Sequence, residues 1–443
     1  MDKKALKLMD IILDELKGRM SYDQSIEKKK EIASGVLNNF YGDMDKSGLF
    51  GKSTRLKAQE KKEKFIEELF SFGFISDVLS NPELEDIVIN TPDSIYIHHM
   101  REGLVKLDEK FSCPEELDIF LKKLLVFSGR TDLKKINDLE LPFVKGRVNI
   151  VFSPFGHQVT ITKIREKPMS IIELIRKESL DCLQAAWLWL CIEGLGSRPA
   201  NILISGGPGA GKTTLLNALV SFIPKKERLV VIEDSLELDI SDDRNCSRLE
   251  SEVGLSMKDL VRNSLRMRPD RLMVGEVRGE EAQDMITAMN VGKYCMGTIH
   301  SSSAKEVLLR LIHRPMGVPE ELLNLIDLLV MVKKMQFDGK IFRAVTEITE
   351  TSRMAGKRPL LNHLWEFDYK QLKAKHVSEP SVFREKLVEA TNFDAPQILK
   401  EIDRRVKLLK RIAEENIIEL DDVSNICQDY IDNPEVVLAK FKI

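Results

Sequence analysis

The chain has 443 residues, of which 43% are hydrophobic and 31% are charged, and its formal net charge is −3. This length exceeds what one ordinary hydrophobic core accommodates and favours roughly two to four domains. The small net charge excludes a global attraction to nucleic acid or to anionic lipid. The cysteines include no C-x-x-C pair, which argues against a zinc ribbon and a disulfide framework and fits a reducing compartment.

Two parts are predicted before residue 166. Residues 1–64 form a charged helical extension, in which apolar residues from Leu6 to Leu16 recur at helical spacing. The start of this extension, Met-Asp-Lys-Lys, has no features of a secretory signal. Residues 65–165 predict an α+β domain, because helical segments alternate with short strand-like runs that turn at proline, glycine and aspartate.

A linker is expected at residues 166–180, because Glu166-Lys167-Pro168 interrupts the regular pattern. The longest apolar run of the chain follows at Ala185–Ile192 and is too short to span a bilayer. We therefore expect a buried helix there, and any role at a membrane would be peripheral.

Strands and helices alternate through residues 181–345, which predicts a parallel sheet with helices on both faces. Ligands of such sheets bind beyond the carboxyl ends of the strands. Residues 346–443 are expected to form a mostly helical C-terminal subdomain. Two strand-like segments, at 340–348 and 362–368, come before its helices.

A glycine-rich turn lies between an apolar strand, residues 202–205, and a helical segment, which is the context that a phosphate-binding loop requires. The glycines let successive backbone N–H groups turn inward, and the positive end of the helix points to the same place. Lys212 supplies a mobile charge for the β- and γ-phosphates, and the Thr213 hydroxyl can bind Mg²⁺. The predicted phosphate-binding residues are Gly206, Gly207, Pro208, Gly209, Ala210, Gly211, Lys212, Thr213 and Thr214.

The next apolar strand ends in two carboxylates, Glu233 and Asp234, and Glu237 follows them. A carboxylate at this place can orient the water that attacks the γ-phosphate, or it can hold Mg²⁺ through water. The alternative is an acidic exit from a strand without a catalytic role, since acidic pairs are common in loops.

Two further strands end in groups that suit a nucleotide site. The run Val274-Gly275-Glu276 predicts that Glu276 projects beside the metal at a Walker B position, without crowding from a side chain at Gly275. His300 ends the following strand and can hydrogen-bond a phosphate, whereas a lone histidine elsewhere is more often structural.

The order of these motifs resembles the hexameric ATPases of type II and type IV secretion, type IV pilus assembly and archaeal flagellum assembly. The resemblance covers roughly residues 65–343 and rests on the phosphate loop, on Ile232-Glu233-Asp234, on the run from Leu265 to Gly279 and on Thr298-Ile299-His300. Within this family, the chain is most similar to the type IV secretion, tight-adherence and archaeal branches. Two features indicate this: the arginines between Ser264 and Asp270, and the lack of a four-cysteine metal motif.

The resemblance implies an α/β fold with a RecA-like P-loop NTPase core, joined to an N-terminal α+β domain and flanked by helical extensions. Six subunits would form a ring, with ATP and Mg²⁺ bound between the two domains. Glu233 would activate water, Glu276 would support Mg²⁺ together with Thr213, and His300 would sense the γ-phosphate. Arg147 would reach ATP from the N-terminal domain.

One position departs from the family pattern. A second arginine is usual on the strand that follows Arg147, and Thr162 stands in its place. Threonine cannot form the bidentate contact that a guanidinium makes with phosphate. Either Lys163 or Arg165 replaces the missing charge, or the charge is lost and turnover is slow.

The resemblance thus implies an ATP-hydrolysing hexameric motor at the cytoplasmic side of a membrane. It would act on a polytopic platform protein and move pilin-like or secreted substrates indirectly. One alternative is a motor that translocates nucleic acid, which the net charge argues against. The other is a scaffold that binds nucleotide and hydrolyses it weakly.

Overall fold

The structure is a computed structural model that describes residues 3–46, 55–132, 134–144, 146–154, 156–165, 167–241, 243–252, 254–355 and 358–443. Glu166 of the predicted linker lies outside the described residues. The chain divides into two units, one formed by Met1–Glu166 with Asp338–Ile341 and the other by Lys167–Phe337 with Phe342–Ile443. Each unit has its own sheet and its own hydrophobic clusters.

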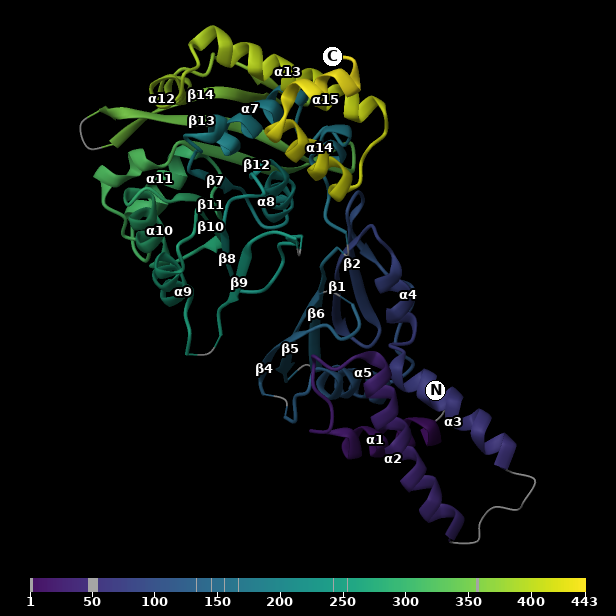
Figure 1. The fold of residues 1–443 in the computed structure, drawn as a ribbon. Coiled ribbons are helices and arrows are strands. Elements are labelled where there is room, and N and C mark those ends of the chain that lie inside the picture. Colours follow the sequence, from purple (N-terminus) through teal and green to yellow (C-terminus); the bar gives the residue numbers. More distant parts are fainter. Residues whose placement is uncertain are drawn as a thin grey trace. The chain divides into compact units, whose positions relative to one another are not determined.

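The first unit is built on an antiparallel six-stranded sheet with the order β3-β2-β1-β6-β5-β4 (Figure 1). Alternate residues such as Ile87, Val148 and Ile161 are buried in one cluster with the helices, so one face of the sheet carries the core. The elements are α1 (Lys3–Leu16), α2 (Ile26–Lys46), α3 (Arg55–Phe70), α4 (Phe74–Ser80), β1 (Leu84–Thr91), β2 (Ser94–His99), β3 (Gly103–Lys106), α5 (Pro114–Phe127), β4 (Ile136–Glu140), β5 (Gly146–Ser153) and β6 (Gly156–Lys163).

The N-terminal helices share this core, and the predicted apolar face of α1 is confirmed as buried in it. Two buried lysines add polar contacts between the helices. Lys123 of α5 donates to the carbonyl oxygens of Glu68 at 2.6 Å and Ser71 at 2.7 Å, and Lys29 of α2 donates to that of Phe127 at 2.9 Å. Burial lowers the pKa of Lys123 to about 8. Carbonyls at helix ends attract positive charge, so the ammonium groups tie α2 and α3 to α5.

The second unit contains a nine-stranded sheet with the order β15-β14-β13-β12-β7-β11-β10-β8-β9. The pairs from β12 to β9 are parallel, as predicted, and β13 to β15 extend the sheet with antiparallel pairs. The strands are β7 (Ile202–Ser205), β8 (Leu229–Glu233), β9 (Cys246–Glu250), β10 (Arg271–Val277), β11 (Tyr294–Ile299), β12 (Leu328–Phe337), β13 (Lys340–Ala355), β14 (Arg358–Asp368) and β15 (Lys373–His376).

Helices cover both faces of this sheet, which confirms the prediction from the alternating pattern (Figure 1). Along β7, Ile202 and Ile204 belong to one cluster, whereas Leu203 points into the cluster on the opposite face. The helices are α6 (Ile171–Arg176), α7 (Cys182–Glu193), α8 (Lys212–Leu219), α9 (Met257–Ser264), α10 (Glu281–Asn290), α11 (Ala304–Ile312), α12 (Val382–Ala390), α13 (Ala395–Glu414), α14 (Leu420–Asp432) and α15 (Pro434–Phe441).

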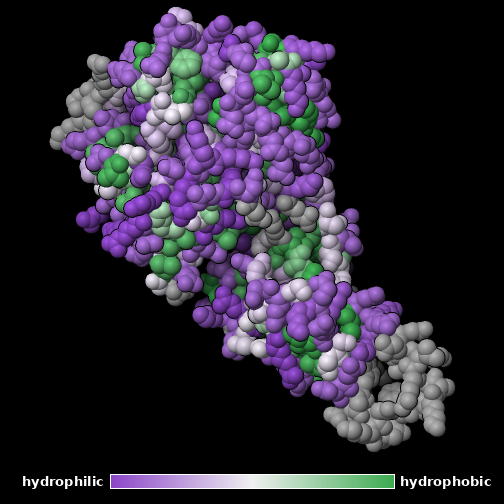
Figure 2. Space-filling view, viewed as in Figure 1, coloured by the Kyte–Doolittle hydropathy of each residue, from purple (hydrophilic) through white to green (hydrophobic). Residues whose placement is uncertain are grey.

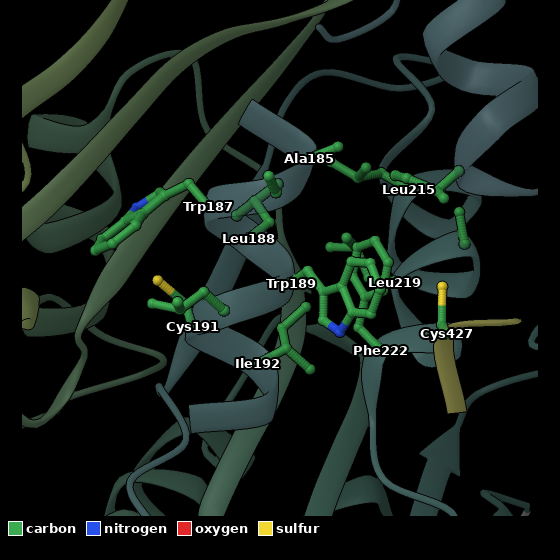
Figure 3. Packing of buried hydrophobic residues seen from close by; sticks show 14 of the residues in the cluster. Ala185, Trp187, Leu188, Trp189, Cys191, Ile192, Leu215, Leu219, Phe222 and Cys427 are labelled. Carbon is green, nitrogen blue, oxygen red and sulfur yellow. The ribbon is translucent and has the colours of Figure 1, made fainter. Parts of the chain in front are cut away.

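The apolar run 185–192 lies in α7, and this helix is buried as predicted (Figure 3). A capping box at Asp181 begins it, and Gly194 ends it with a left-handed backbone at φ 64°. Trp189 stacks on Phe222 at 5.0 Å between ring centroids. No helix in the described part of the chain is long and apolar enough to cross a membrane. The face drawn in Figure 2 is mostly hydrophilic, with hydrophobic residues in small groups.

Candidate active site

The glycine-rich turn lies between the carboxyl end of β7 and the start of α8, as predicted. A Cβ on Gly206 would lie 2.2 Å from the carbonyl oxygen of Val332 on β12, so only glycine fits there. Gly209 and Gly211 have φ angles of 63° and 97°, which residues with a Cβ atom rarely adopt. Gly211 is also the N-cap of α8 and offers no side-chain acceptor, so the first N–H groups of the helix suit an anion.

Lys212 begins α8, and its side chain is buried against the loop and His300. Its ammonium donates to the carbonyl oxygen of Gly207 at 3.2 Å and lies 3.5 Å from both ring nitrogens of His300. Burial lowers the pKa of Lys212, and the carboxylate of Glu276 opposes this shift. The lysine therefore lies within a group of charges that spans the ends of β7, β10 and β11.

Glu276 is the centre of this group. One carboxylate oxygen lies 2.7 Å from Nε2 of His300 but accepts no hydrogen bond, and the other accepts from Arg278. Arg278 also donates to Asp234 at 3.1 Å and so links β10 to the end of β8. Burial opposes ionisation of Glu276, but Arg278, His300 and Lys212 outweigh it and lower its pKa.

His300 follows β11 and is held by neighbouring groups. Arg310 of α11 donates to its carbonyl oxygen at 2.7 Å, and Thr298 donates to the carbonyl oxygen of Gly275 at 2.6 Å, which ties the end of β11 to β10. Burial and the charge of Lys212 lower the pKa of His300. A neutral imidazole carries one N–H donor, which can bind a phosphate oxygen.

Glu233 ends β8 and is only 1% exposed. Its Oε1 accepts from the backbone N–H groups of Glu237 at 3.0 Å and Leu238 at 2.9 Å. Its Oε2 accepts no hydrogen bond and lies 3.6 Å from the guanidinium of Arg248 on β9. Burial raises the pKa of Glu233, against the opposing effect of the two backbone bonds. A Cβ on Gly275 would lie 3.0 Å from Cγ of Glu233, so this glycine makes room for Glu233.

The predicted arginines lie in the first unit. Arg147 of β5 stands opposite Thr162 of β6 and opposite Glu140 of β4 in the strand register. The threonine that replaces the family's second arginine is therefore a direct cross-strand neighbour of Arg147. Lys163 donates to the carbonyl oxygen of Asn81 at 2.9 Å, and Arg165 lies 3.9 Å from the sulfur of Met100.

Three cationic side chains near the loop, those of Arg278, Lys334 and Arg343, have no role in the nucleotide site that was predicted from the sequence. Arg278 was quoted within a motif, but its bridge between Glu276 and Asp234 depends on which strands are neighbours. Lys334 of β12 and Arg343 of β13 flank the loop from the other side, and Arg343 donates to the carbonyl oxygen of Gly209 at 2.8 Å. No local sequence signal indicates these contacts, because they follow from the position of β12 beside β7.

The loop suits the phosphates of a nucleotide, because Gly206 is required by a close contact, Gly209 and Gly211 are favoured by their positive φ angles, and the start of α8 has no side-chain cap. Among the described residues, no group of three or more His, Cys, Asp or Glu side chains could hold a metal ion alone. Thr213 and Glu276 are candidates to share a Mg²⁺ with bound phosphate oxygens, because hydroxyl, carboxylate and phosphate oxygens are ligands that Mg²⁺ accepts.

This sheet and its loop define a P-loop NTPase with a RecA-like core. The profile of the family described as type II/IV secretion system protein matches residues 138–351. The chain is 35% identical over 331 residues to the type IV secretion system protein VirB11 of Bartonella quintana, covering 62% of this chain and 90% of VirB11. It therefore belongs to the type II/IV secretion system family.

Two other comparisons cover more of the chain. An uncharacterized protein of Methanocaldococcus jannaschii is 28% identical over 396 residues, which cover 83% of this chain and 69% of that protein. Among solved structures, the ATPase DotB of Yersinia pseudotuberculosis is similar with a TM-score of 0.48 and 16% identity, covering 81% of this chain and 92% of DotB.

Proposed function

We propose that this protein binds ATP at the loop 206–213 and hydrolyses it to ADP and phosphate. The observation that carries the proposal is the convergence of Lys212, His300 and Glu276 at the ends of neighbouring strands. A loop that only binds nucleotide needs the lysine and the backbone N–H groups. The carboxylate and the imidazole add groups that can respond to the γ-phosphate.

Each group has a proposed role in hydrolysis. Lys212 neutralises the β- and γ-phosphates, and the N–H of His300 donates to an oxygen of the γ-phosphate. Thr213 and Glu276 hold Mg²⁺, which would offset negative charge on the same phosphates. Glu233 orients the attacking water through Oε2, because Oε1 is held by its own loop. Its raised pKa favours acceptance of a proton.

We further propose that six subunits form a ring in which ATP binding closes the domain 65–165 onto the domain 181–345 across the hinge 166–170. Arg147, with Arg165 as a weaker candidate, would approach the nucleotide from the N-terminal domain. The ring would act at the cytoplasmic side of a membrane on a polytopic platform protein and so drive assembly of a pilus-like filament or secretion. Membership of the type II/IV secretion system family supports this proposal.

Glu233→Gln tests the catalytic assignment. We expect the variant to bind ATP while releasing phosphate at least about 100-fold more slowly than the wild type, because positioning of water and proton transfer are lost. Multiple-turnover phosphate release gives the rate, and equilibrium titration with a fluorescent ATP analogue gives the affinity. Glu250→Gln is the matched control, since Glu250 is exposed and stands opposite Glu233 on β9. Near-normal phosphate release by Glu233→Gln would exclude this role.

A further inference from the structure

The phosphate loop has two different flanks. Since β7 lies between β11 and β12, the loop that follows it is bordered by the end of β11 on one side and by β12 with β13 on the other. Lys212 reaches the β11 side, where its ammonium lies 3.5 Å from His300. The β12 side carries two cations that the proposed hydrolytic group does not use, Lys334 and Arg343.

Both cations lie against the glycines of the loop. Nε of Arg343 donates to the carbonyl oxygen of Gly209 at 2.8 Å, and its Cδ lies 3.8 Å from the place that a Cβ on Gly211 would occupy. Nζ of Lys334 lies 3.8 Å from the corresponding place on Gly209. The same glycines have the left-handed backbone that turns N–H groups toward a phosphate. The two side chains thus border the loop where a polyphosphate would pass.

The direction of a bound triphosphate follows from the β11 side. Lys212 contacts the β- and γ-phosphates in phosphate-binding loops, and here its ammonium is directed to His300 and Glu276. A triphosphate with its γ-phosphate at His300 and its other phosphates over the loop extends away from β11. Its α- and β-phosphates then lie toward the β12 side.

We propose that Lys334 and Arg343 bind the α- and β-phosphates of the nucleotide from within the same unit as the loop. This inference rests on the proposed function and adds a second set of phosphate-binding cations to it. The α- and β-phosphates are present in both ATP and ADP, so contacts to them do not distinguish substrate from product. Loss of such contacts raises KM rather than lowering kcat, because they bind ground state and transition state alike.

Arg343→Ala and Lys334→Ala test the proposal. We expect each substitution to weaken binding of both ADP and a non-hydrolysable ATP analogue by about tenfold, the usual effect of removing a charged hydrogen-bond donor. Affinities come from titration with fluorescent analogues in the presence of Mg²⁺. Lys373→Ala is the matched control, because Lys373 is an exposed cation of β15 in the same sheet. Arg343→Lys, which keeps the charge, serves if Arg343→Ala does not fold.

The outcomes separate this inference from the proposed function. Equal affinities of wild type, Arg343→Ala and Lys334→Ala for ADP would overturn the inference, as would an equal loss in Lys373→Ala, which would reveal a bulk charge effect. A loss confined to the ATP analogue would also overturn it, because it would place the cations at the γ-phosphate. If Lys212→Ala bound nucleotide like the wild type, the proposed function itself would fail. Lost binding in Lys212→Ala with normal binding in Arg343→Ala would refute the inference alone.

Discussion

The two flanks of the phosphate loop differ in how their charged groups are connected. On the β11 side, Lys212, His300, Glu276 and Arg278 contact one another and influence one another's pKa values. On the β12 side, the contacts described above run from cations to the loop, and Arg343 bonds to its backbone. Charged groups that contact one another can exchange these contacts when a phosphate binds or leaves. Charges that contact only the loop mainly raise the affinity for the nucleotide.

The largest effect is expected where the β12 side touches the start of the loop. Gly206→Ala would place a methyl group 2.2 Å from the carbonyl oxygen of Val332, so the loop or β12 must move. We expect the free energy of unfolding to fall by about 1–3 kcal/mol, as for overpacked interiors, and nucleotide affinity to fall with it. Chemical denaturation measures the first quantity.

Gly207→Ala is the control for this clash, because a Cβ at Gly207 would meet no atom within 4 Å. We expect its free energy of unfolding to stay within about 0.5 kcal/mol of the wild type, as for ordinary surface changes. Equal stability of both variants would show that the approach of Val332 to the loop is looser than described.

A smaller and more selective effect is expected on the β11 side. His300→Ala removes a donor that can reach the γ-phosphate, so we expect affinity for an ATP analogue to fall about fivefold, within the range of one neutral hydrogen bond. Affinity for ADP should change little, in contrast to Arg343→Ala. Parallel titrations of both nucleotides provide the measurement. An equal loss for ADP and the ATP analogue would remove the distinction between the two sides.

The β11 side could be predicted from the sequence, and the β12 side could not. Glu276 and His300 each end a strand of a parallel sheet, and such ends meet at one edge whatever the order of the strands. The contacts of Lys334 and Arg343 depend on β12 lying beside β7, which local spacing does not encode. The role of Arg147 stays a prediction.

Much of the fold could be predicted for the same reason. The strand–helix alternation and the uninterrupted apolar run of α7 are strong signals in the sequence, and both are confirmed. The shared core of the N-terminal helices and the first sheet depends on contacts between segments far apart in the sequence. The bonds of Lys29 and Lys123 to backbone carbonyls of other helices are long-range contacts as well. The position of Gly275 was identified, but the prediction concerned Glu276, whereas the glycine makes room for Glu233.

Multiple-turnover phosphate release from ATP and Mg²⁺, compared between the wild type and Lys212→Ala, tests the central claim most directly. We predict that each wild-type subunit releases many equivalents of phosphate, while the variant stays at the level of a protein-free control, because the charge that neutralises the β- and γ-phosphates is absent. Equal release by the two proteins, or no release by a folded wild type, would contradict the claim that this loop is the site of ATP hydrolysis.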